Sequence, residues 1–292
     1  MLFDNDRPRY LPHMENPEVL LMGLSPLRDG AWFETDNDLA RYRQHKLDYR
    51  QRYGDRAYRA APSSEIAQRE LSARILEYLT TEQPDLYRLE NDQLFCPGVE
   101  TPLPIESEQP LWNCSQWVAD DLVLMEEIDG EYCLTAASLC CPSHWRLEEK
   151  FGRPLGEIHD PIPGFHQALT PRIDRFLKHL RPQHPVVRFN WSIQAYESLS
   201  QRPEQEVSIE PGQLLYYRSE RQSLVRLPGS NAIAFTIRVY LHPLAALAEV
   251  PGAMKTLFNA IDGTPELLAD YKGFAQLQPA LARYRVGSAT KD

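Results

Sequence analysis

The sequence predicts an α+β fold, in which a curved antiparallel sheet carries helices on one side and helical extensions at both ends. Residues 36–79 place apolar side chains at three- and four-residue steps, and helical patterns return beyond Pro243. Between these segments, apolar and polar side chains alternate at 233–239, as in a half-buried strand. We therefore expect a single domain with a helical part at about 1–90, a sheet core at about 91–245 and a helical part at about 246–292.

The sheet is expected to contain about five or six strands. The clearest signal is the turn Asp129-Gly130 between the apolar runs DLVLMEE and YCLTAASLC, because Asp-Gly favours tight hairpins. Further strands are predicted at PVVRFNWSIQ, QLLYYRSE, QSLVRLP and NAIAFTIRVYL. A helix with one apolar face is predicted at roughly 164–180, between the hairpin and the later strands.

Composition excludes several classes of protein. The net charge of −10 disfavours nucleic-acid binding, which needs a basic surface. No run of 18 apolar residues is present, and the acidic start MLFDNDRPRY does not resemble a signal peptide, so we expect a cytoplasmic protein without a membrane partner. The five cysteines show no CxxC spacing, and no nucleotide-binding loop or dinucleotide fingerprint is found. Any nicotinamide chemistry would therefore lie on another chain.

The stretch GRPLGEIHDPIPGF holds the leading candidate for a metal ligand, His159. The ordinary interpretation is a loop histidine that bonds a nearby carbonyl group. However, Pro161 and Pro163 stiffen the backbone directly after it and a helix is predicted to follow, which favours the rigid placement that a ligand needs. Imidazole is also the commonest metal ligand.

Two cysteines compete with His159 as ligands. Cys141 and Cys96 each precede a proline at the end of a predicted strand, and a thiolate can bind haem iron. The ordinary interpretation of both is a small buried hydrophobic residue.

Polar and aromatic residues on the predicted strands are candidates for lining a ligand pocket. Arginines alternate with apolar residues in SERQSLVRLPGSNAIAFTIRVYL, either as surface charges or as inward groups that bind carboxylates. Asn190-Trp191 is a polar-aromatic pair in mid-strand, although tryptophan is more often a core residue.

Several stretches together resemble the DUF3445 family, which includes the haem subunit of a haem-dependent oxidative N-demethylase acting on dimethylamine. They occur in the family's order over roughly 20–245 and read LMGLSPLRDGAWFETD, DLVLMEE, AASLCCPSHW, EKFGRPLGEIHDPIPGF, RFNWSI and ERQSLVRLPGSNAIAFTIRVYL. One departure is that Phe is expected where this chain has Cys140 or Cys141 before Pro142, which keeps the thiolate alternative open.

The resemblance implies a PAS-like domain that binds haem b and activates dioxygen. It implies a separate reductase, with NADPH and flavin or iron–sulfur on that partner chain, in a homo- or hetero-oligomer. Hydroxylation of an N-methyl group of a small alkylamine would then give formaldehyde and the demethylated amine. At the positions that match the family's motifs, the resemblance implies His159 as the axial ligand and Arg221 and Arg226 as anchors for the haem propionates.

Further site residues are expected from the chemistry of haem and of a cationic amine. We expect Arg238, Trp145 and Asn190 to contribute to cofactor binding. For the amine, an acid or aromatic face is expected on the distal side, with these candidates: Glu220, Trp191, Tyr217 and Tyr216. Two alternatives remain at this point, a PAS-like haem or small-molecule sensor without turnover, and a haem-free structural subunit.

Overall fold

The computed structural model describes residues 8–28, 31–143, 145–160, 162–163, 169–202 and 209–288. Its main element is a seven-stranded antiparallel sheet in the order β1-β8-β9-β10-β6-β7-β2. The strands are β1 Ser25–Pro26, β2 Tyr58–Ala60, β6 Asp121–Ile128, β7 Glu131–Ser138, β8 Val186–Gln194, β9 Tyr216–Arg226 and β10 Ile233–Pro243. A smaller three-stranded sheet contains β3 Arg88–Glu90, β4 Gln93–Phe95 and β5 Leu103–Pro104.

The predicted hairpin is confirmed. Strands β6 and β7 pair from Ile128 and Glu131 onward, and the turn residues Asp129 and Gly130 have φ values of 53° and 86°. Positive φ at both central positions is what a tight hairpin turn requires, and Gly130 accepts it without steric cost.

Two predictions about the strands need correction. The segments QLLYYRSE and QSLVRLP form the single strand β9, since no turn-forming residue separates them. The main sheet also gains β1 and β2 from the first 90 residues, which the sequence predicted to be helical. These two strands are only two and three residues long, too short to show a strand pattern.

Helices lie around the sheet, and short 3-10 turns lie between some helices and strands. The α-helices are α1 Pro12–Glu15, α2 Leu39–Tyr53, α3 Glu65–Glu82, α4 Pro110–Ser115, α5 Leu147–Lys150, α6 Leu155–Ile158, α8 Thr170–His179, α9 Ala253–Asp262, α10 Glu266–Tyr271 and α11 Phe274–Ser288. The 3-10 turns are η1 Gly54–Arg56, η2 Pro62–Ser64 and η3 Leu244–Glu249. The helix predicted at 164–180 corresponds to α8 from Thr170, and 164–168 lie outside the described residues. No helix in the described part of the chain has the length and apolar character needed to cross a bilayer.

Helices pack on both faces of the sheet, which corrects the expectation of helices on one side. On β6, Leu122 and Leu124 belong to a core with α3 and α4, whereas Val123 and Met125 belong to a core with α5, α6 and α8. Successive strand residues point to opposite faces, so these two cores lie on opposite sides of the sheet. The continuous apolar run in DLVLMEE is the sequence signal for this double burial.

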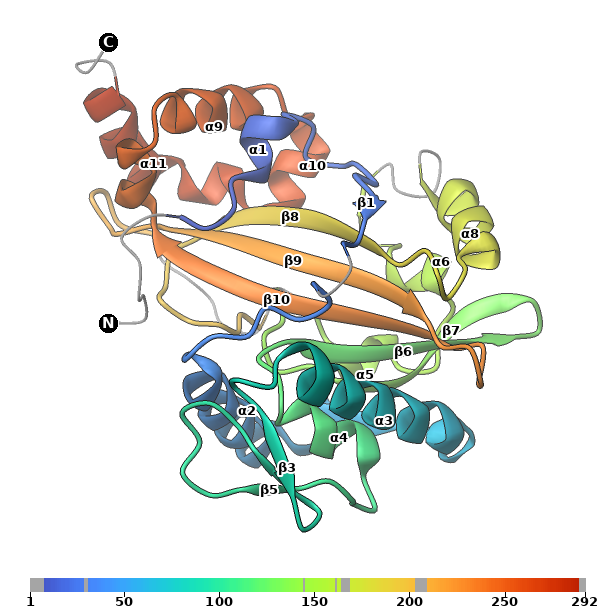
Figure 1. Cartoon of the computed structure of the whole chain (residues 1–292). Helices are drawn as coiled ribbons and strands as arrows, with labels where there is room; N and C mark the ends of the chain where they lie inside the picture. The colour runs from blue at the N-terminus through green and yellow to red at the C-terminus, as the bar shows by residue number, and fades with distance from the viewer. Residues whose placement is uncertain are drawn as a thin grey trace.

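The C-terminal helices α9 and α11 share a sheet face with α2–α4 but cover different strands. Trp191 of β8 and Tyr217 of β9 form a third core with α9 and α11. By strand alternation and pairing register these two residues lie on the same face as Leu122. Figure 1 shows α9–α11 beside β8 and α2–α4 beside β6, with the middle strands between the two groups. We call this side the helical face and the other the cavity face.

Candidate functional site

A cavity of about 330 Å³ lies on the cavity face, within the range of roughly 300–1,000 Å³ typical of ligand sites. Its apolar part is formed by β6, β10 and the short helix α6. The main apolar side chains are Val123, Met125, Leu155, Ile158, Phe235 and Ile237. Its polar part is formed by β8, β9 and the end of α10. The polar side chains there are Arg188, Asn190, Ser192, Glu220, Gln222 and Lys272.

His159 lies in the cavity wall directly after α6. Its Nδ1 lies 2.9 Å from the carbonyl oxygen of Leu155, and its own carbonyl accepts a bond from the backbone N–H of Ile162 at 2.9 Å. Because a carbonyl only accepts, Nδ1 carries the proton and the lone pair of the neutral ring lies on Nε2. Fixing the tautomer through the other ring nitrogen is how proteins orient a metal-binding imidazole.

Cys141 also lines the cavity, but its surroundings disfavour a thiolate. Burial raises the pKa of this thiol well above its usual value, and the Asp121 carboxylate beside it adds to the shift. That carboxylate accepts the backbone N–H of Cys141 at 2.7 Å. Cys96 lies in the core with α3 and α4, away from the cavity lining, and burial raises its pKa to about 12. Both sulfurs therefore stay protonated at neutral pH.

Glu220 is held by a dense set of donors at the polar end of the cavity. Its Oε1 accepts Nε of Arg218 at 2.8 Å, and its Oε2 accepts Gln222 at 2.9 Å and Asn190 at 3.3 Å. Burial alone would raise the pKa of this carboxyl, but Arg218 and the hydrogen bonds outweigh burial and hold the pKa below its usual range. Glu220 is therefore ionised and already paired.

Trp145 completes the group of expected residues that the structure brings together. It lines the cavity with His159, Asn190 and Glu220, although these four come from β8, β9 and the segment between β7 and α8. His144, beside Trp145, lies outside the described residues.

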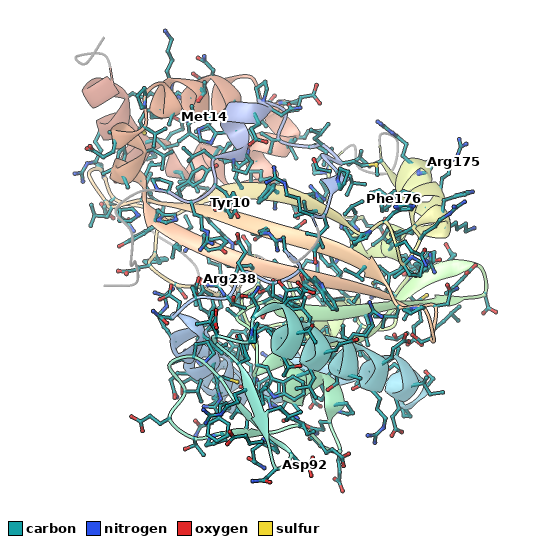
Figure 2. All side chains as sticks on the ribbon, viewed as in Figure 1. Tyr10, Met14, Asp92, Arg175, Phe176 and Arg238 are labelled. Atoms are coloured by element: carbon teal, nitrogen blue, oxygen red, sulfur yellow. The ribbon has the colours of Figure 1, made fainter. Side chains whose placement is uncertain are left out.

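Arg221 and Arg238 lie on the helical face, opposite the cavity. The Arg221 guanidinium donates to the carbonyl oxygens of Ala31 and Trp32. Nη2 of Arg238 donates to both carboxylate oxygens of Asp36, at 3.1 and 2.8 Å, and Figure 2 shows Arg238 at the side of the sheet where α2 lies. Their register explains the placement, since Arg221 pairs with Arg238 across β9 and β10 and both side chains point to one face.

Arg226 points to the cavity face but lies beyond the cavity. Its guanidinium donates to the carbonyl oxygens of Leu177 and Leu180 at the end of α8 and to the hydroxyl of Tyr132. It also donates to the carbonyl and side-chain oxygens of Asn231, both at 2.8 Å. All three nitrogens are thus used to attach α8 and the β9–β10 turn to the sheet.

Trp191 and Tyr217 belong to the core beneath the C-terminal helices. Their rings stack with centroids 6.0 Å apart, and the Tyr217 hydroxyl lies 2.8 Å from Nδ1 of the buried His13. Tyr216 is half-buried, donates weakly to Glu197 at 3.4 Å and is outside the cavity lining. The structure does not bring these three aromatic residues to the cavity.

The sequence did not mark the cations in the described lining, Arg146, Lys150, Arg188 and Lys272, of which the last two lie in its polar part. The sequence could have predicted Arg188, because it lies two residues before Asn190 on the same strand and alternate strand residues point to the same face. Lys272 follows α10, more than 80 residues along the chain, and no local pattern marks it.

A mainly apolar cavity between an antiparallel sheet and short helices, with one oriented imidazole and a few polar groups, is typical of an α+β protein that binds a small molecule or cofactor. The family comparison specifies the class further. The model of the haem-dependent oxidative N-demethylase, alpha subunit-like family matches residues 23–282, so the chain belongs to this family. The family name describes a haem-dependent oxidoreductase and the alpha-type subunit of a multi-subunit complex.

The residues in the cavity fit a haem. Haem is apolar except for two carboxylates, so it needs an apolar slot, an axial donor and nearby cations. The cavity provides the apolar side chains of β6 and β10, the oriented imidazole of His159 and the cations of the polar end. The donor chemistry thus agrees with the cofactor in the family name.

Proposed function

We propose that the protein is the haem-binding subunit of an oxidative N-demethylase that acts on a small alkylamine such as dimethylamine. Electrons would come from a separate reductase, and the products would be formaldehyde and the demethylated amine. The observation that carries the proposal is His159, held by Leu155 in the wall of a largely apolar cavity of about 330 Å³. We further propose that the sheet is PAS-like and that the chain forms one haem-binding domain.

In this proposal His159 would hold the haem iron. Its Nδ1 proton would stay on the bond to the Leu155 carbonyl and hold the ring in place, and Nε2 is the atom that we propose would bind the iron. Trp145, Phe235 and Ile237 line the cavity and would supply flat or branched apolar surface that binds the haem and excludes water. When bound, the haem would supply the activation of dioxygen.

The polar end would orient the amine. Glu220 and Asn190 line the cavity and offer oxygen acceptors to an N–H group. Since Arg218 already balances the Glu220 charge, we propose that hydrogen bonding, rather than net negative charge, positions the substrate. We propose structural roles for Arg221, Arg226, Arg238 and Tyr217, because their polar groups bond within the protein. The same holds for Trp191, because its ring packs in the core beneath the C-terminal helices.

Turnover tests the proposal. The haem-loaded protein is supplied with dimethylamine, dioxygen and an electron donor, and formaldehyde and methylamine are measured together. We expect both products in equal amounts, and none from the haem-free protein. Haem binding without either product would instead support a sensor, the alternative function of such a domain.

A further inference from the structure

Two positive side chains line the polar wall of the cavity near Asn190. Arg188 comes from β8 and Lys272 directly follows α10, and both line the cavity. Burial lowers the pKa of Lys272 to about 8; Glu220 opposes this shift and the positive charge of Arg188 adds to it. Two cations that repel each other at a cavity wall need a reason to be there.

Neither cation is strongly bound within the protein. Lys272 reaches the side-chain oxygen of Asn190 at 3.4 Å and the carbonyl oxygen of Trp191 at 3.3 Å, both beyond the usual range for N–H···O bonds. Arg188 donates one bond to the carbonyl oxygen of Leu21 at 3.0 Å, and its buried Nε has no hydrogen-bond partner in the described part of the chain. Arg188 and Lys272 can therefore still donate hydrogen bonds to a ligand at this wall of the cavity.

The nearby carboxylate does not balance the two cations. Among the described residues, Glu220 is the acid that acts on the pKa of both Arg188 and Lys272. Its own strongest partner is Arg218, which forms a buried ion pair with it at 2.8 Å. Three cations thus share one carboxylate, and the wall keeps an excess of positive charge in a poorly solvated place. A bound anion would relieve that excess.

We propose that Arg188 and Lys272 form a carboxylate-binding subsite at the polar end of the cavity. The inference rests on the proposed function and deepens it, because it assigns the cavity a polarity: the carboxylate end of the ligand lies at β8 and α10. The carboxylate has two chemical sources, a haem propionate or the acid group of an N-methylated amino acid substrate. The guanidinium offers a planar pair of donors, and the ammonium adds a point charge.

Iron-free porphyrins separate this subsite from iron ligation. Protoporphyrin IX carries two carboxylates and its dimethyl ester carries none, and quenching of tryptophan fluorescence measures the binding of each. We expect the diacid to bind about tenfold or more tightly than the diester. Arg188→Met and Lys272→Met should each reduce the preference, whereas Lys272→Arg should retain it.

Two lysine variants serve as matched controls. Lys150 also lines the cavity and is only 8% exposed, and Lys255 is exposed on α9. Lys150→Met and Lys255→Met should both keep the preference for the diacid. Loss of the preference in Lys150→Met, with Lys272→Met unaffected, would overturn the proposal.

A second arm distinguishes the two sources of the carboxylate. If both porphyrins bind equally well, the haem-loaded protein is titrated with N-methylglycine and with dimethylamine, and the visible spectrum is recorded. Tighter binding of N-methylglycine that is lost in Lys272→Met assigns the subsite to the substrate. Equal binding of both amines would then refute the proposal.

The carboxylate subsite can be tested even if the protein does not bind haem. If neither porphyrin binds, the thermal stability of the protein alone is measured with N-methylglycine and with dimethylamine. Stabilisation by N-methylglycine alone, absent in Arg188→Met and Lys272→Met, keeps the carboxylate subsite while rejecting the haem. Absence of such stabilisation rejects both.

Discussion

Arg218 and Glu220, two residues apart on β9, form an ion pair beneath the cavity wall, with 2.8 Å between Nε and Oε1. Both side chains point to the same face because they are two positions apart on one strand. The other nitrogens of Arg218 donate to the carbonyl oxygens of Leu199 and Cys141, so the guanidinium also attaches two neighbouring loops. The pair thus connects Glu220 in the cavity wall to the loops that contain Cys141 and Leu199.

Glu220→Gln is expected to destabilise the fold by about 3 kcal/mol, because it leaves the charge of Arg218 buried without its partner. Urea unfolding monitored by circular dichroism measures the change in unfolding free energy. The exposed Glu127→Gln on β6 is the matched control and should change stability by less than about 0.5 kcal/mol. Equal stability of the two variants would contradict the structural role of the pair.

Stability should depend on pH through Lys272. Its pKa is lowered to about 8 in the folded protein, against about 10.4 in an unfolded chain. Between these values the unfolded chain binds more protons, so the free energy of unfolding contributed by Lys272 rises with pH, by about 3 kcal/mol in total. Below pH 8 Lys272 is charged in both the folded and the unfolded protein. Its burial then lowers the free energy of unfolding by an amount that no longer changes with pH.

The comparison of wild type with Lys272→Met isolates this effect, because all other titrating groups contribute to both proteins. We expect the difference in unfolding free energy, measured without haem from pH 7 to 10.5, to move in favour of the wild type as pH rises. A difference that stays constant over this range would show that Lys272 has an ordinary pKa.

Arg226→Met should impair folding but not cofactor binding. The substitution removes donors to the end of α8, to Tyr132 and to Asn231, and we expect a loss of about 3 kcal/mol. The exposed Arg69→Met, which removes only a surface pair with Glu65, should cost less than about 1 kcal/mol. Haem titration of the folded variant should match the wild type, and a large loss of haem affinity would instead identify Arg226 as a propionate anchor.

The sequence predicted much of the fold, because its signals are local. The Asp129-Gly130 turn and the alternation in β10 depend only on neighbouring residues, and both hold in the structure. The helices on both faces were missed, although the unbroken apolar run at the start of β6 indicated burial on both sides. The two-residue strand β1 depends on pairing with β8 and has no local signal.

The candidate site was predicted less completely, because it depends on register. Asn190 and Glu220 point into the cavity, whereas the adjacent Trp191 and Arg221 point to the opposite face. Composition cannot reveal which of two neighbours faces a ligand when both are polar or aromatic. Lys272 joins the site only through the packing of α10 against β8, a contact over long sequence separation.

The most direct test of the account is a titration of the haem-free protein with haem b, followed by absorption spectroscopy in the Soret region. The account predicts a strong band for the wild type and for Cys141→Ser. His159→Ala should weaken or shift this band, and added imidazole should restore it. An unchanged spectrum in His159→Ala, or loss of the band in Cys141→Ser, would contradict the assignment of His159 as the iron ligand.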